Sequence, residues 1–193
     1  MINRRDVNII SPWHHGAGFY VNATQAPWNR HYRMYDYVLN ELPTLVESMF
    51  PLNDQRSIAG HSMGGHGALV LALRNPERYR SVSAFSPISN PVNYPRGKKA
   101  FAAYLGKDTA AWAEYDASLL MRQASRFVPA LVDQGEADDF LAEQLKPETL
   151  EAAARISGYP LELNRREGFD HGYYFIASFI EQHLRFHAGY LAR

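Results

Sequence analysis

The sequence predicts an α/β fold with a mainly parallel sheet flanked by helices. Short apolar runs alternate with longer amphipathic segments along the 193 residues, which is typical of strands alternating with helices. A glycine-rich turn with a serine at its apex, within 58–69, joins one such run to a helical pattern. Apolar residues make up 46% and charged residues 21% of the chain, so we expect a single domain over 1–193.

The first elements lead up to this turn. A short apolar run predicts a strand at 7–11, which a proline ends. Apolar side chains then recur at helical spacing over 35–49, which predicts an amphipathic helix kinked by Pro43. The run at 55–59 is expected to be the strand that feeds the turn. The helix after the turn is expected to stop before Pro76.

The elements after the turn repeat the alternation. Short apolar runs predict strands at 81–85 and 130–135. Between them, 91–126 contains prolines, a glycine and several short helical patches, and we expect this insertion to form a cap over a pocket. The remaining predicted elements are a helix at 145–156, a strand at 161–164 and an amphipathic helix at 173–186.

The composition argues against several classes of partner. Basic and acidic side chains cancel at 20 each, so there is no electrostatic case for a nucleic acid or an anionic membrane as a partner. Cysteine is absent, which excludes disulfides and cysteine-ligated metals. No apolar run approaches the roughly 20 residues that span a bilayer, and no signal peptide is evident. We therefore expect a cytoplasmic protein.

Residues 60–64 read Gly-His-Ser-Met-Gly, the pattern of a nucleophile elbow in α/β-hydrolases. Strain in such an elbow holds the hydroxyl of Ser62 above the sheet, and the flanking glycines let the neighbouring backbones approach. The backbone N–H of Met63, at the start of the following helix, is expected to form half of an oxyanion hole. In this fold the second donor comes from a loop before the elbow, and no segment within 1–57 convincingly resembles that loop.

A serine hydroxyl needs an imidazole as base, and the imidazole needs a carboxylate that fixes its tautomer. In α/β-hydrolases the three groups follow in the order serine, acid, histidine, each just beyond a strand. The base candidate is His171, after the strand at 161–164. The acid candidates follow the strand at 130–135, where Asp138 and Asp139 remain rivals because spacing alone cannot separate them.

The other polar candidates are expected to have different roles. Glu136 lies too close to the strand end to be favoured as the acid. We expect a structural role for Asp133 and Asp170, and either packing or support of the catalytic groups for His61. His66 is expected in the core or on the helix surface, and His183 and His187 on a solvated helix face.

The segment 60–69 resembles the elbow of S-formylglutathione hydrolases, the esterase D family. Further segments resemble signatures of the same family, namely 16–20, 31–35, 80–88, 97–101, 104–106, 133–135 and 170–180. The resemblance implies a cytosolic serine hydrolase that cleaves the thioester S-formylglutathione to glutathione and formate without a cofactor. It implies Ser62 as nucleophile, His171 as base and Asp138, rather than Asp139, as acid. It also implies a small-molecule substrate and a homodimer.

The sequence departs from the family pattern in three places. Family members carry a substantial region before the segment at 16–20, and we expect the fold to lack the first strands that this region forms. Arg96 replaces a family tryptophan, and Asn22 stands where the family usually has aspartate. Two alternatives therefore stay open: a general short-chain carboxylesterase, or an inactive chain that retains the triad residues.

Overall fold

The computed structural model describes residues 18–192. They contain a four-stranded sheet whose neighbouring strands are parallel and follow one another in chain order. The strands are β1 (Ile58–His61), β2 (Val82–Phe85), β3 (Ala130–Gly135) and β4 (Leu161–Arg166). The predicted α/β fold with a parallel sheet is confirmed. The strand predicted at 7–11 lies outside the described residues.

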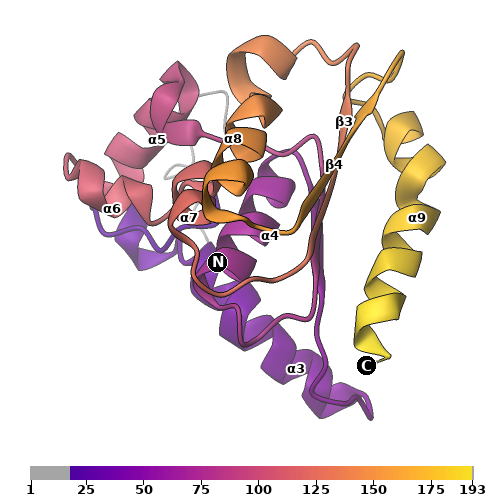
Figure 1. Ribbon diagram of the computed structural model, residues 1–193. Helices are drawn as coiled ribbons and strands as arrows, with labels where there is room; N and C mark the ends of the chain where they lie inside the picture. Colours follow the sequence, from indigo (N-terminus) through magenta and orange to yellow (C-terminus); the bar gives the residue numbers. More distant parts are fainter. Residues whose placement is uncertain (1–17, 193) are drawn as a thin grey trace.

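Helices cover both faces of this sheet (Figure 1). α9 lies on one face, and α4, α7 and α8 lie on the opposite face, with α5 and α6 beyond them. The helical segments are η1 (Trp28–Arg30), α2 (Met34–Asp36), η2 (Tyr37–Glu41), α3 (Leu42–Met49), α4 (Met63–Arg74), η3 (Pro91–Asn93), α5 (Pro95–Leu105), α6 (Thr109–Ala113), α7 (Ala117–Gln123), η4 (Leu141–Leu145), α8 (Pro147–Ser157) and α9 (Tyr173–Leu191). This layered arrangement leaves the carboxyl ends of the strands free to hold a site.

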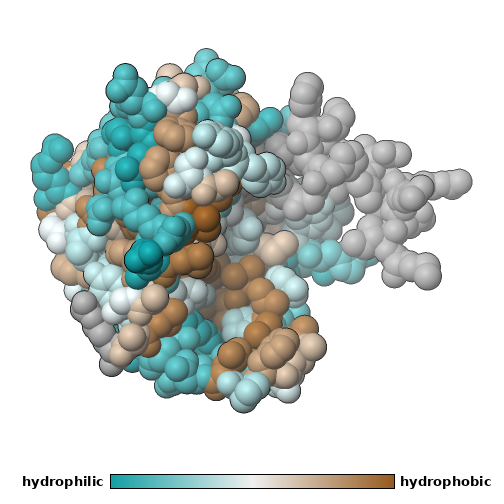
Figure 2. All heavy atoms as spheres, turned by 90° about the vertical axis from the view of Figure 1, so that its right-hand side faces the viewer, coloured by the Kyte–Doolittle hydropathy of each residue, from teal (hydrophilic) through white to brown (hydrophobic). Residues whose placement is uncertain are grey.

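The core lies between the two central strands and the helices on the α4 side. β2 and β3 are buried along their whole length, which explains why their sequences read as short apolar runs rather than as alternating patterns. Fully buried side chains of α4, α7 and α8 pack in the same cluster, including Leu69, Met121 and Leu150. On the other face α9 leaves several apolar side chains exposed, and Figure 2 shows apolar atoms gathered across the middle of that face.

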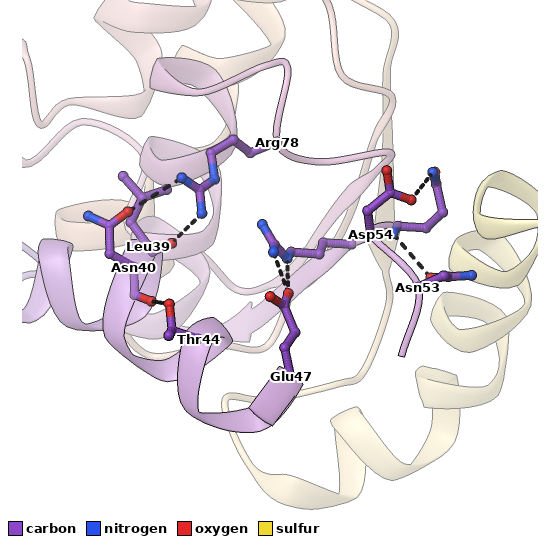
Figure 3. Close-up of polar contacts among 9 residues, drawn as sticks. Leu39, Asn40, Thr44, Glu47, Asn53, Asp54 and Arg78 are labelled. Carbon is purple, nitrogen blue, oxygen red and sulfur yellow. Dashed lines mark hydrogen bonds and ion pairs between the residues drawn. The ribbon is translucent and has the colours of Figure 1, made fainter. Parts of the chain in front are cut away.

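Pro43 changes the helix predicted over 35–49. A wider π-helical turn, η2, joins α2 to α3, so three segments replace one regular helix. Proline has no N–H and cannot donate to the carbonyl of Leu39 four residues earlier. That carbonyl accepts a hydrogen bond from Nη2 of Arg78 at 2.9 Å instead (Figure 3). A side chain from the loop after α4 therefore satisfies the acceptor that the proline leaves open.

The other predicted elements are present with shifted ends. β1 begins at Ile58 rather than at 55, and α9 continues to Leu191 rather than ending at 186. The segment 91–126 contains η3, α5, α6 and α7, in agreement with the helical patches of its sequence. The Tyr104 carbonyl on α5 accepts a hydrogen bond from the Thr24 N–H at 2.8 Å, which ties α5 to the segment before η1. Within residues 18–192, no helix combines the length and apolarity needed to cross a membrane.

Candidate active site

Ser62 lies in a strained turn between β1 and α4. Its backbone has φ of +57° and ψ of −118°, a conformation that residues other than glycine rarely adopt. A Cβ at Gly60 would lie 2.2 Å from the carbonyl oxygen of Gly64, so only glycine fits there. At Gly64 itself the nearest atom would be 3.4 Å away, and the further tight contacts fall at Gly65, at 3.1 Å, and at Gly67, at 2.4 Å. The close approach predicted at both flanking glycines is thus found at Gly60 and not at Gly64.

The turn after β2 anchors the elbow through the backbone. The Ser62 N–H donates to the carbonyl of Phe85 at 2.9 Å, and the Ile88 N–H donates to the carbonyl of Ser62 at 3.4 Å. The Ser62 carbonyl also accepts the His66 N–H at 3.0 Å, which is the first hydrogen bond of α4. Bonds from β2 and α4 therefore hold the strained serine in place.

The structure brings Asp138 and His171 together at the carboxyl ends of β3 and β4. Nδ1 of His171 lies 2.6 Å from Oδ2 of Asp138, the distance of a short, charge-assisted hydrogen bond. Asp138 is buried, and its Oδ1 accepts the N–H of Phe140 at 2.9 Å. Asp139, its sequence rival, is exposed. A bond at Nδ1 leaves Nε2 of the imidazole available to a second partner.

The same contacts determine the charge state of Asp138. Burial raises the pKa of this carboxyl, but hydrogen bonds from His171, Phe140 and Ser86 and the charge of His171 outweigh that effect, and the net pKa lies below the ordinary value of 3.8. Asp138 is therefore ionised at neutral pH. An ionised carboxylate is the form that holds the Nδ1 proton of His171 and stabilises the imidazolium.

His61 contacts the candidate base, His171, and is adjacent to the serine of the elbow. Its ring centroid lies 4.5 Å from that of His171, and His61 directly precedes Ser62 in the chain. Burial lowers the pKa of His61, and the neighbouring charge of His171 lowers it further. His61 is half-buried, and its Nε2 has no hydrogen-bond partner among the described residues. The expected packing role of His61 is thus a contact with the ring of the candidate base.

Met63 is the first residue of α4, so its N–H is one of those that the helix leaves without an intrahelical acceptor. The helix dipole adds positive potential at this end. The oxyanion-hole role expected for this N–H stays a prediction. His66, one turn further, is fully buried, and burial lowers its pKa to about 4, so it belongs to the core.

The expectation for His183 and His187 is wrong. Both face the sheet from α9, with 1% and 8% of their surface exposed, instead of lying on a solvated helix face. The His183 ring stacks on Phe85 with centroids 3.8 Å apart. His187 reaches two serine hydroxyls on and beside β2, at 2.8 Å each. The pattern of apolar residues along α9 does not predict this contact, because the side chains buried against the sheet here are imidazole rings.

Asp133 pairs with side chains that the sequence does not single out. Its buried carboxylate binds Nη2 of Arg166 at 3.1 Å and Nδ2 of Asn164 at 3.0 Å, and Nε2 of His183 lies 3.6 Å away. In the register of β3 and β4, Asn164 stands opposite Asp133 and Arg166 opposite Gly135. The parallel pairing of β3 and β4 could therefore have predicted that Arg166 lies near Asp133. Asp133 has the structural surroundings expected for it.

Asp170 also has its expected surroundings. Its Oδ1 accepts the N–H of Gly172 at 2.8 Å and so braces the loop that carries His171. Within 18–192, no three His, Asp or Glu side chains cluster closely enough to hold a metal ion.

Comparisons with known proteins agree with this geometry. A family model described as "Putative esterase" matches residues 1–186. An S-formylglutathione hydrolase from Agrobacterium tumefaciens superposes with a TM-score of 0.88 and 47% identity over 91% of this chain, which spans 64% of that protein. An S-formylglutathione hydrolase from Staphylococcus aureus gives a TM-score of 0.64 and 23% identity over 87% of this chain and 67% of the other, a likeness of fold.

The A. tumefaciens match confirms the resemblance read from the sequence motifs. The match covers 91% of this chain at 47% identity, so it is not confined to the elbow motif. The α/β-hydrolase fold, the elbow and the family model point to the same assignment. The chain belongs to the esterase family of α/β-hydrolase proteins.

Proposed function

We propose that the chain is a cytoplasmic serine hydrolase that cleaves S-formylglutathione to glutathione and formate. Ser62 is the nucleophile, His171 the base and Asp138 the acid that orients the base. The observation that carries this proposal is the 2.6 Å hydrogen bond between His171 and Asp138, together with a serine held at positive φ in the turn after β1. The 47% identity to an S-formylglutathione hydrolase supports the choice of substrate.

The reaction follows the usual two halves of serine hydrolysis. His171 Nε2 accepts the proton of the Ser62 hydroxyl as its oxygen attacks the formyl carbon. The N–H of Met63 stabilises the resulting oxyanion. Collapse breaks the carbon–sulfur bond, and His171 returns the proton to the glutathione sulfur. Water, deprotonated by His171, then attacks formyl-Ser62, and His171 returns that proton to the Ser62 oxygen as its bond to the formyl carbon breaks and formate is released. Asp138 stabilises the imidazolium in both halves.

We also propose that the segment 91–126 forms a cap over this site. The segment begins three residues after Ile88, whose N–H contacts the carbonyl of Ser62. Asp116 at the start of α7 accepts hydrogen bonds from Asn90 at 3.1 Å and from the Val92 N–H at 3.2 Å, which closes the segment on its own entrance. A homodimer is proposed from the family resemblance alone.

The substrate is tested by comparing two leaving groups. Purified protein is assayed for kcat/KM with S-formylglutathione and with p-nitrophenyl acetate at the same pH. We expect a clear preference for the thioester, because the glutathione moiety adds binding energy that the small ester cannot provide. A preference for p-nitrophenyl acetate would favour a general carboxylesterase instead. Hydrolysis of neither substrate would favour an inactive chain.

A further inference from the structure

Phe140 lies two residues after Asp138, in the loop that follows β3, and its backbone is fixed on both sides. Its N–H donates to Oδ1 of Asp138 at 2.9 Å. Its carbonyl accepts the N–H groups of Gln144 and Leu145, at 3.0 and 3.1 Å, where η4 begins. Leu145 is buried in the core. Hydrogen bonds therefore set where the Phe140 side chain leaves the backbone, relative to the Asp138 carboxylate.

The ring of Phe140 packs against the candidate base. Its centroid lies 5.0 Å from that of the His171 imidazole, and the two planes make an angle of 77°. This is the edge-to-face arrangement that aromatic pairs prefer. The ring of His61, from the end of β1, contacts the same imidazole with centroids 4.5 Å apart. Rings from two separate elements thus pack on His171.

These ring contacts supply what the hydrogen bond to Asp138 lacks. The bond from Nδ1 of His171 to Oδ2 of Asp138, at 2.6 Å, fixes one point of the imidazole. It does not by itself fix the plane of the ring, because the imidazole can turn about the direction of that bond. The position of Nε2 depends on this plane. Packing that allows a single orientation of a side chain is what makes a site precise.

The Phe140 ring also lies outward of the acid and the base. The Asp138 side chain is fully buried, the His171 side chain is 22% exposed, and Phe140 is 41% exposed. Because Phe140 is more exposed than the imidazole it contacts, its ring covers part of that imidazole from solvent. A hydrogen bond shielded from water is electrostatically stronger than an exposed one. The same ring can therefore orient the imidazole and protect its bond to Asp138.

We propose that Phe140 is a positioning residue, whose ring fixes the plane of the His171 imidazole so that Nε2 faces the Ser62 hydroxyl. This inference rests on the proposed function, since it needs His171 to serve Ser62. Phe140 exchanges no proton and acts through His171. Its N–H holds the acid and its ring holds the base, so one residue aligns the two groups with each other.

The test is the Phe140→Ala variant, which removes the ring and keeps the backbone N–H that binds Asp138. Loss of the edge-to-face contact predicts about a tenfold fall in kcat with S-formylglutathione, with KM nearly unchanged, because the ring acts on the base and not on the substrate. Phe140→Tyr keeps the ring and should retain the wild-type kcat. The far-downfield NMR resonance of the Nδ1 proton of His171 should exchange with water faster in Phe140→Ala than in the wild type.

Phe127→Ala is the matched control. Phe127 is 46% exposed, and its ring meets that of Tyr159 edge-on, with centroids 5.2 Å apart and planes at 71°. It precedes β3, at the opposite end of that strand from Asp138. This variant loses an aromatic contact of the same kind and exposure. Its melting temperature should fall about as far as that of Phe140→Ala, while its kcat stays at the wild-type value.

Three results would overturn the role of Phe140. They are a wild-type kcat in Phe140→Ala, an effect on KM alone, which would make the ring a substrate contact, and an equal loss of kcat in Phe127→Ala. Failure of the proposed function looks different. Activity that survives Ser62→Ala would overturn that function itself, and with it the role of Phe140.

The role of Phe140 can also be measured without the thioester. If the wild-type protein does not hydrolyse S-formylglutathione, the substrate assignment alone is overturned, and the rate at which a fluorophosphonate labels Ser62 replaces kcat. Phe140→Ala should then label about tenfold more slowly than the wild type and than Phe127→Ala, because labelling also needs an oriented base. Equal labelling rates in the three proteins would overturn the role of Phe140.

Discussion

The carboxylate of Asp138 accepts hydrogen bonds from a side chain and from the backbone. His171 binds one oxygen at 2.6 Å, and the Phe140 N–H binds the other at 2.9 Å. Its neighbour Asp139 is exposed and has no such contact among the described residues. Spacing along the chain cannot make this distinction, because both residues follow the same strand. The two residues are distinguished by the burial and the direction of their side chains.

This difference predicts the effect of two matched substitutions. Asp138→Asn should lower kcat by about 10⁴-fold, because an amide can donate to His171 and so favours the wrong tautomer of the imidazole. Asp139→Asn removes the same charge from the adjacent exposed position and should leave kcat close to the wild-type value. Steady-state rates with S-formylglutathione measure both. Equal losses in the two variants would contradict the assignment of the acid.

At the scale of elements, α9 is held to the sheet by polar as well as apolar contacts. His187 meets the hydroxyls of Ser81 and Ser83 at 2.8 Å each, while His183 stacks on Phe85. Burial and, as a smaller effect, the nearby charge of His183 together lower the pKa of His187 to about 4. The folded protein therefore keeps the His187 ring neutral at pH values where an unfolded chain would bind a proton.

His187 consequently makes stability depend on pH. Its contribution is complete above the ordinary pKa of 6.5 and is lost as the pH falls from 6.5 toward about 4, because the unfolded state binds a proton there and the folded state does not. The slope approaches about 1.4 kcal/mol per pH unit. Urea unfolding at pH 7.5, 6 and 5 should show this loss, and His187→Gln should show a smaller slope. An unchanged slope in the variant would contradict the buried, neutral histidine.

The sequence predicts the elements better than it predicts their contacts. Apolar runs and breakers locate β3 and the end of α4 closely, because local propensity and burial agree there. Pro43 predicts an irregularity in the helix. The sequence does not predict the hydrogen bond from Arg78 to the Leu39 carbonyl, because Arg78 lies in a loop 35 residues further along the chain. Likewise, the helical pattern of α9 gives its position but not the burial of its histidines, which depends on hydroxyls of β2.

For the whole molecule, parallel strand order explains why the candidate site assembles. The four strands end at the same edge of the sheet, so the turn after β1 and the loops after β3 and β4, which carry Ser62, Asp138 and His171, lie along that edge. The placement of Asp138 and His171 just beyond two neighbouring strands is sufficient to predict that these two side chains meet. The hydrogen bond from Gln134 to the Ser86 hydroxyl is not predictable in the same way, because it joins two neighbouring strands at a residue with positive φ.

The central claim is that Ser62 is an activated nucleophile, and covalent labelling tests it most directly. Intact-mass spectrometry after incubation with a fluorophosphonate should show one adduct per chain, and peptide mapping should place it on Ser62. The Ser62→Ala variant should gain no adduct, and His171→Ala should label far more slowly because the base is lost. An unlabelled wild-type protein, or an adduct that persists in Ser62→Ala, would contradict the account.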